Sequence, residues 1–281
     1  MTVYAVMGSC LANLTGVFLM HDYRWERLNN ASGLRSDHYL NYFIERTQTM
    51  PPKDTLLSML QFEPKTEPEA RQRVEENYIE TCGRFQMPGE GPGLFENLEK
   101  EAFDVFLFDN LYDIARRSTI YKPRAGEDGF SLYLPLNRFA NAIELRERFR
   151  YGDYLSGREA AKNWARIIEY VRQRQPQAKL FFLCGHYCTS LEHPDRYRRA
   201  VEFYLTLREL GTGLGVHVVP PLDLDIALTK APDDFYHYDM SVYKALAGYI
   251  QASVVGKWPL LSRPPNLPDH VLSLAGYDVE T

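Results

Sequence analysis

The sequence predicts an α/β fold, a three-layer α/β/α arrangement in which a central parallel sheet lies between two layers of helices. Two short apolar runs, 103–108 and 179–184, are typical of strands buried on both faces. Segments with the apolar spacing of a helix alternate with such runs, and this order implies right-handed crossovers between parallel strands. The length of 281 residues suits a single domain of this class, spanning 1–281.

The first part of the chain is expected to begin the sheet and then to become less regular. The expected elements are a strand at 3–7, a helix at 11–20, a strand at 23–28, a turn-rich loop at 29–33 and a helix at 35–48. The stretch 49–100 starts with several prolines and contains an expected charged helix at 67–82 and a Gly/Pro loop at 88–93. We interpret 49–100 as a cap or lid inserted in the domain, or else as a decorated connection.

The rest of the chain continues the alternation of strand and helix. The helix expected at 157–174 has Trp164, Ile168 and Val171 on one face, which predicts that this face packs on the sheet. The other expected elements are strands at 103–108, 179–184 and 216–219, helices at 194–210 and 239–253, a loop with short strands at 122–137, and a proline-rich tail.

Composition and charge argue against several classes of function. Lys and Arg number 32 against 37 Asp and Glu, and this net charge of −5 disfavours a nucleic-acid partner. No apolar run approaches the roughly 18 residues of a membrane-spanning helix, and the N-terminus lacks the features of a secretion signal. Four cysteines do not imply a disulfide framework, so reduced thiols in the cytoplasm are expected. The oligomeric state is left open.

In a parallel α/β sheet the ligand site lies at the carboxyl ends of the strands. Candidate site residues therefore come directly after the expected strands. They are Ser9, the 29–33 loop, Asp109 and Asn110, Gly185 and His186, and the 220–237 loop.

Ser9 and His237 support the first chemical hypothesis. Ser9 stands at the start of a helix, where free backbone N–H groups and the helix dipole favour a developing oxyanion. The same position suits a serine that only caps the helix, and the two roles are compatible. His237 follows Asp234 by three residues, so it is either a base oriented by that carboxylate or a surface histidine in an acidic loop.

In this order the motifs resemble those of the SGNH hydrolase superfamily of GDSL-like esterases and lipases. The first block is Gly8-Ser9-Cys10, which is similar to the Gly-Ser-Cys subgroup that includes the GSCFA domain. Gly33 matches the second block, and Asp234-x-x-His237 matches the fifth. The resemblance implies a flavodoxin-like fold in which Ser9 attacks an ester, His237 is base and then acid, Asp234 orients His237, and the Gly33 N–H binds the oxyanion.

The third block departs from the family pattern, which has a glycine two residues before its asparagine. Here Phe108 occupies that place, and Asn110 is the candidate for the oxyanion-binding amide. Asn13 on the first helix is the alternative. The departure concerns the oxyanion hole and leaves the expected fold unchanged.

The resemblance implies a small acyl ester as substrate, including acetylated sugars and polysaccharide precursors, with no metal or redox cofactor. An esterase and an O-acyltransferase share one acyl-serine intermediate, so the resemblance does not separate them. Carbohydrate or another small-molecule ester is the expected partner, rather than nucleic acid or membrane.

Two alternatives stay open. The segment 8–13 also resembles the start of bacterial capsule acetyltransferases that bind coenzyme A, in which Cys10 at the helix N-terminus would be the reactive group. Ser9 and Leu11 replace the Asn and Gln of that pattern. The other alternative is a non-catalytic binding protein on the same fold, because a fold does not fix a function.

Other polar residues are candidates for substrate contacts. His186 follows an expected strand, and Arg35 belongs to a set of cations that would favour an anionic substrate if they converge, or would form a solvated basic face if they do not. That set is Arg35, Arg116, Arg117, Lys122 and Arg124. Cys184, His186 and Cys188 lack a second Cys/His pair at finger spacing, so no metal site is predicted.

Overall fold

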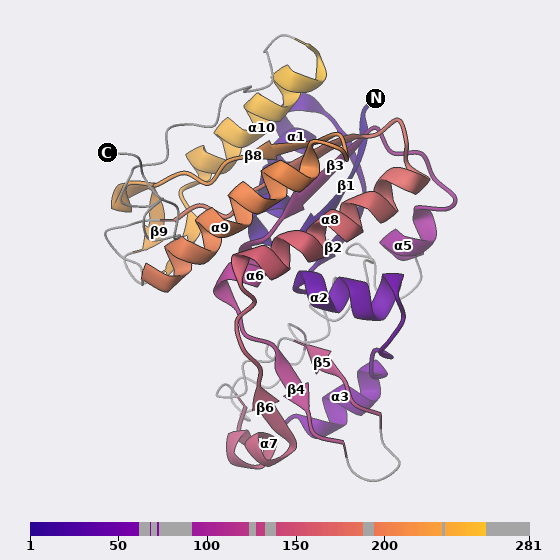
Figure 1. Ribbon diagram of the computed structural model, residues 1–281, viewed down its shortest axis with the longest axis vertical. Coiled ribbons are helices and arrows are strands. Elements are labelled where there is room, and N and C mark those ends of the chain that lie inside the picture. Colours follow the sequence, from indigo (N-terminus) through magenta and orange to yellow (C-terminus); the bar gives the residue numbers. More distant parts are fainter. Residues whose placement is uncertain are drawn as a thin grey trace.

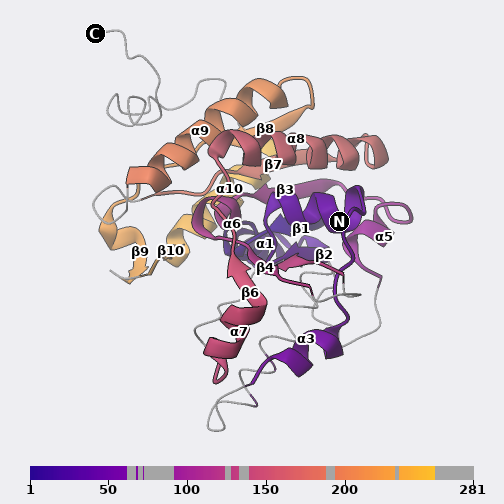
Figure 2. The ribbon, with the colours of Figure 1, turned by 60° about the horizontal axis from the view of Figure 1, so that its bottom comes forward.

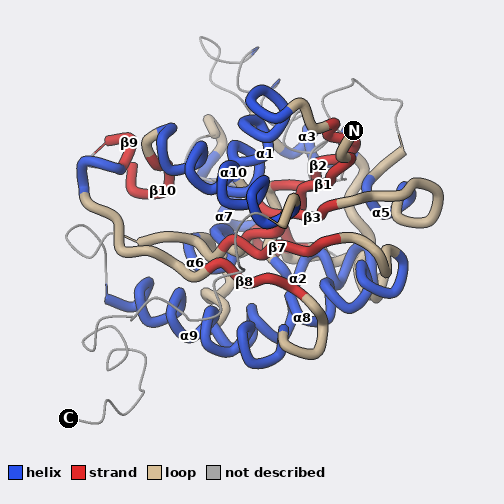
Figure 3. The backbone as a smooth tube through the Cα atoms, turned by 90° about the horizontal axis from the view of Figure 1, so that it is seen from above, coloured by secondary structure: helices blue, strands red, loops and turns tan. Residues whose placement is uncertain are grey.

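A five-stranded parallel sheet forms the centre of the protein in the computed structural model, which describes residues 1–61, 68, 72, 92–123, 128–132, 139–187, 194–231 and 234–256. The strands are β1 (Val3–Gly8), β2 (Glu26–Ser32), β3 (Val105–Asp109), β7 (Lys179–Leu183) and β8 (Val216–Val219). Their order across the sheet is β2-β1-β3-β7-β8, and every neighbouring pair is parallel (Figure 3). This is the doubly wound order of flavodoxin-like sheets, so the expected fold class is confirmed.

Helices cover both faces of the sheet. On one face lie α1 (Cys10–Tyr23) and α10 (Met240–Val254), and on the other lie α8 (Gly157–Arg174), α9 (Pro194–Gly211) and the short α2 (Ser36–Tyr39) (Figure 3). The central strands send alternate side chains into two separate cores. Phe106 and Phe108 belong to the core under α8 and α9, whereas Val105 and Leu107 belong to the core under α1 and α10. Burial on both faces explains why the strand sequences are apolar without alternation.

Helix α8 shows how local sequence fixes an element. Ser156 and Glu159 form a reciprocal capping box at its N-terminus, which satisfies backbone donors that the helix leaves free. Trp164 is completely buried and packs edge-on against Phe108 and Phe182 of the sheet. The predicted bounds of this helix, 157–174, match the observed ones.

A smaller lobe projects from the α/β/α body (Figures 1 and 2). Its three-stranded antiparallel sheet has the order β5-β4-β6. The lobe consists of α3 (Lys53–Met59), β4 (Thr119–Tyr121), β5 (Ser131–Leu132), α7 (Ala142–Arg148) and β6 (Phe149–Tyr151). The amide of Ala140 donates to the carbonyl of Gln61 at 2.8 Å, so the lobe joins two distant chain segments. Most of the expected insertion 49–100, with its helix at 67–82, lies outside the described residues, as does the proline-rich tail.

Several elements differ from the expected ones because tertiary pairing overrides local propensity. The turn formers Asn29 and Asn30 continue β2, since they pair with Ala5 and Val6 of β1. In place of the single helix expected at 35–48, the structure has the short helix α2 followed by a π-helical turn, η1 (Leu40–Ile44). The loop expected at 220–237 contains a 3₁₀ turn and a β-hairpin. The remaining elements are α5 (Leu94–Asn97), α6 (Leu111–Ala115), η3 (Ile226–Leu228), β9 (Thr229–Ala231) and β10 (Asp234–Tyr238).

None of the helices in the described ranges is both long and apolar enough to cross a membrane.

Candidate active site

A small cavity of about 40 Å³ lies beyond the carboxyl ends of β1 and β3. Three chain segments meet there: the start of α1, the helix α6 with the residue after it, and β10. The lining residues are Ser9, Cys10, Leu111, Tyr112, Ala115, Arg116 and His237. The structure therefore brings Ser9 and His237, the two residues expected to react, to one cavity.

The sheet register explains this convergence. Gly8 ends β1 beside Ser32 of β2, and Met7 lies beside Phe108 of β3. The residues that follow these strands, among them Ser9, Gly33 and Asn110, therefore leave the sheet at the same edge. This is the edge at which parallel α/β sheets place their ligands.

Ser9 is almost completely buried, with 2% of its surface exposed. Its Oγ donates a hydrogen bond of 2.7 Å to Oδ1 of Asp109 and accepts one of 3.3 Å from the amide of Leu11. Its own backbone N–H donates to Oδ2 of Asp109 at 2.7 Å. Ser9 thus caps α1, and its hydroxyl proton is directed at Asp109.

Asp109 was a candidate site residue by its position at the end of an expected strand, but the sequence assigned it no chemical role. Besides its two bonds with Ser9, it accepts hydrogen bonds from the amides of Ala12 and Leu111. Burial raises the pKa of this carboxyl, and the hydrogen bonds from Ser9, Ala12 and Leu111 act in the opposite direction. Asp109 also explains the glycine of the first block, since a Cβ on Gly8 would lie 2.7 Å from its Oδ2. The sequence feature that pointed to Asp109 is its position at the end of a buried strand, where parallel sheets place their sites.

Cys10 and His237 approach the cavity from opposite parts of the chain. Cys10 is the first residue of α1 and is partly exposed. His237 is partly buried and lies in β10, next to the buried Tyr238. Asp234 lies in the same strand rather than in a turn before the last helix, and its side chain is outside what the structure describes.

The two expected oxyanion donors occupy different environments. Gly33 directly follows β2 with a φ of 87°, a left-handed conformation that favours glycine. Asn110 is fully buried, and its Oδ1 accepts a 2.8 Å hydrogen bond from the amide of Gly185. Its Nδ2 finds no partner among the described residues. The alternative, Asn13, accepts a hydrogen bond from Arg27.

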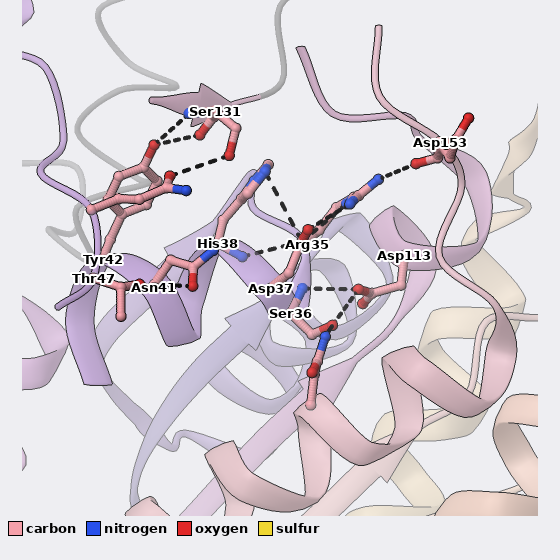
Figure 4. Close-up of polar contacts among 12 residues, drawn as sticks. Arg35, Ser36, Asp37, His38, Asn41, Tyr42, Thr47, Asp113, Ser131 and Asp153 are labelled. Carbon is pink, nitrogen blue, oxygen red and sulfur yellow. Dashed lines mark hydrogen bonds and ion pairs between the residues drawn. The ribbon is translucent and has the colours of Figure 1, made fainter. Parts of the chain in front are cut away.

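The two expected substrate contacts are absent from the cavity lining. His186 is buried, its Nδ1 accepts from the amide of Leu222 at 3.1 Å, and burial lowers its pKa to about 4, so the ring is neutral near pH 7. Arg35 is buried with its guanidinium bonded to Asp37 and to the carbonyl of Asp153 (Figure 4). Of the described cations in the expected set, Arg116 borders the cavity, and Arg124 lies outside the described residues.

Cys184 is buried, and burial raises the pKa of its thiol well above the usual range, so it stays protonated. Cys188 lies outside the described residues. Within the parts of the chain that the structure describes, no three His, Cys, Asp or Glu side chains gather as metal ligands would.

No protein-family profile and no curated protein matches the sequence. Among solved structures, a carbohydrate esterase family 2 enzyme with a carbohydrate-binding domain from Corynascus thermopiles (Myceliophthora fergusii) is 11% identical, with a TM-score of 0.46 over 92% of this chain and 67% of that one. A protein classed as a GDSL-like lipase from Parabacteroides merdae is 11% identical, with a TM-score of 0.42 over 92% and 96% of the two chains.

A family two carbohydrate esterase from Clostridium thermocellum, in complex with cellohexaose, is 10% identical, with a TM-score of 0.47 over 91% of this chain and 64% of that one. The chain thus spans about two thirds of the length of these carbohydrate esterases. One of these neighbours is classed as a GDSL-like lipase, and the Gly-Ser-Cys subgroup is not shown.

Proposed function

We propose that this protein is an ester-acting acyl-transfer enzyme, an esterase or an O-acyltransferase, whose active centre is the cavity at the start of α1. One observation carries the proposal. A hydroxyl and a thiol residue, Ser9 and Cys10, border the same small cavity as His237 at the ligand-binding edge of the sheet. A nucleophile beside an imidazole is the arrangement that acyl transfer requires.

In the proposed reaction His237 takes the proton of the nucleophile, which attacks the ester carbonyl carbon, and then returns the proton to the leaving alcohol. Ser9 is the nucleophile that the family resemblance assigns. In the structure its Oγ donates to Asp109, so Ser9 can act only if that hydrogen bond is exchanged for one to His237. Asp234 is proposed to orient His237, and Gly33 and Asn110 are proposed to bind the oxyanion.

The cavity limits the acyl group. Its volume of about 40 Å³ is small beside the roughly 300–1,000 Å³ of pockets that bind drug-sized ligands. We therefore propose a short acyl group, such as acetyl, carried by a small alcohol or a sugar. Water as the acceptor gives an esterase, and an acceptor hydroxyl gives a transferase.

The test is hydrolysis of p-nitrophenyl esters of increasing chain length, with and without an added sugar acceptor. Acetyl is expected to be the best acyl group, and His237→Gln is expected to lower kcat/KM by about 10²–10⁴-fold. His217→Gln is the matched control, because His217 is a partly buried histidine that bonds Tyr249 and does not border the cavity. Folded protein without turnover of any ester would favour a non-catalytic binding protein instead.

A second candidate, a coenzyme A-dependent acetyltransferase, is favoured by the partly exposed Cys10 at the N-terminus of a 14-residue helix. The test is to replace the p-nitrophenyl ester by acetyl-coenzyme A and to measure transfer of the acetyl group to the added sugar acceptor. Transfer from this donor, without hydrolysis of simple esters, would support the second candidate over the first.

A further inference from the structure

We infer that Cys10, and not Ser9, carries the acyl group. This inference rests on the proposed function, since it assigns the nucleophile of that same cavity. It gives Ser9 a structural role in the turn and places a thioester on the reaction path.

The first reason is that the Ser9 hydroxyl is already engaged. The Oγ of Ser9 donates a hydrogen bond of 2.7 Å to Oδ1 of Asp109 and accepts one from the amide of Leu11. Only 2% of the surface of Ser9 is exposed. To attack an ester, Ser9 would have to give up the bond to a fully buried carboxylate. That carboxylate would then lose one of the hydrogen bonds that offset its burial.

The second reason is the position of Cys10. It is partly exposed, whereas Ser9 beside it is buried, and it borders the cavity together with His237. The cavity is small, about 40 Å³, so an acyl carbonyl bound there would lie near both residues. Cys10 therefore shares its cavity with an imidazole, which is the side chain that can serve as its general base.

Two electrostatic effects oppose each other at this thiol. The N-terminus of α1 favours a thiolate. The Asp109 carboxyl opposes it, because it accepts from Ser9 and Ala12 at that same helix end. A general base is then needed to remove the thiol proton, and His237 is the imidazole that borders the cavity.

The step balances with water as the second reactant. His237 takes the Cys10 proton, the sulfur bonds to the ester carbonyl carbon, and the carbon–oxygen bond to the alcohol breaks as His237 protonates the leaving oxygen. Water, or an acceptor hydroxyl, then attacks the thioester and gives its proton to His237. The carbon–sulfur bond breaks, and the thiolate recovers the proton.

The experiment locates the acyl group. The full-length protein is mixed with p-nitrophenyl acetate, quenched in acid and digested with trypsin. The tryptic peptide 1–24, which ends at the first Lys or Arg of the chain, is then fragmented between Ser9 and Cys10. Neutral hydroxylamine is used in parallel, because it removes an acyl group from a thioester but not from a serine ester.

We expect a hydroxylamine-sensitive acetyl group on Cys10 that is lost in Cys10→Ala, where turnover falls by at least about 10³-fold. Ser9→Ala keeps the adduct. If Cys10→Ala does not fold, Cys10→Ser preserves the shape of the side chain and must still lose the hydroxylamine-sensitive species. A hydroxylamine-resistant adduct on Ser9 that persists in Cys10→Ala would overturn this inference and leave the proposed function intact. Folded wild type with neither an adduct nor ester turnover would overturn both.

A second measurement does not depend on an ester substrate. The rate of alkylation of Cys10 by iodoacetamide, followed on peptide 1–24, is expected to fall by at least about 10-fold in His237→Gln and to be unchanged in His217→Gln. Equal rates in all three proteins would show that His237 does not activate the thiol and would overturn the inference.

Discussion

At the residue scale, Asp109 connects the end of the central strand to the start of the first helix. It accepts four hydrogen bonds, from Ser9 Oγ and from the amides of Ser9, Ala12 and Leu111. These contacts are what place the Ser9–Cys10 turn against β3. The position of the reactive residues therefore depends on a carboxylate that does not border the cavity.

Replacing Asp109 by alanine leaves those buried donors without an acceptor. We expect Asp109→Ala to lower the free energy of unfolding by about 3–5 kcal/mol, measured by urea denaturation. Asp104→Ala is the matched control, because Asp104 is an exposed carboxylate that accepts from the amide of Val3, and we expect it to cost less than about 1 kcal/mol. Equal decreases in the free energy of unfolding of the two variants would contradict the structural role given to Asp109.

The buried carboxyl of Asp113 is expected to make the free energy of unfolding depend on pH. Burial raises its pKa to about 6, although Ser36 and Trp164 donate hydrogen bonds to it (Figure 4 shows the bonds from Ser36). A carboxyl whose folded pKa is raised contributes stability that is fully present below its ordinary pKa near 4 and lost as the pH rises through about 6. Asp113→Asn stays neutral at every pH. Relative to wild type, it should therefore gain up to about 3 kcal/mol between pH 4 and pH 7.

Urea denaturation of both proteins at each pH unit in that range measures this difference. A difference between wild type and Asp113→Asn that is constant from pH 4 to pH 7 would contradict the assigned shift, whatever its absolute value.

At the element scale, α8 and α9 cross closely at Gly157. A Cβ on this residue would lie 2.3 Å from the carbonyl oxygen of Arg199 and 2.6 Å from the amide nitrogen of Phe203. We expect Gly157→Ala to separate the helices and lower the free energy of unfolding by about 1–3 kcal/mol, measured by thermal and urea unfolding. Gly213→Ala, where a Cβ would meet nothing within 4 Å, should change it by less than about 0.5 kcal/mol. A Gly157→Ala variant with an unchanged free energy of unfolding would contradict the close crossing of α8 and α9.

The elements show which parts of the fold were predictable from sequence. Helix α8 and strand β8 have the predicted bounds, because the apolar spacing of α8 and the short run 216–219 are local signals. Strand β2 runs further than predicted, since Asn29 and Asn30 are turn formers that become strand only through their pairing with β1. The β9–β10 hairpin that carries His237 was missed for the same reason.

At the scale of the whole molecule, the cavity exists because residues from distant parts of the chain leave the sheet at one edge. The strand order predicted a site at that edge with Ser9 and the 220–237 loop among its candidates, and the resemblance of the motifs to SGNH hydrolases predicted that Ser9 and His237 would meet there. The sequence could not predict that Ser9 would bond Asp109, because that contact depends on which strand lies next to β1. Nor could it show that Arg35 and His186 are buried, since Arg35 also bonds the carbonyl of Asp153 and His186 bonds the amide of Leu222, both from distant segments.

The fold also sets the size of the cavity, and this predicts acyl specificity. Leu111 borders the cavity from the first residue of α6 and is mostly buried. Leu111→Ala should enlarge the cavity and raise kcat/KM for butanoyl over acetyl esters by about 10-fold or more. The ratio of the two kcat/KM values on p-nitrophenyl esters measures this. An unchanged ratio, in a variant that folds, would show that the acyl group binds elsewhere.

The central claim is that this cavity forms a covalent acyl-enzyme with His237 as the base. The most direct test is the intact mass of the protein, quenched in acid within seconds of mixing with p-nitrophenyl acetate, for wild type, His237→Gln and His217→Gln. We predict one added acetyl group on wild type and on His217→Gln, and almost none on His237→Gln in the same time. Equal acetylation of all three proteins, or none on folded wild type, would contradict the claim.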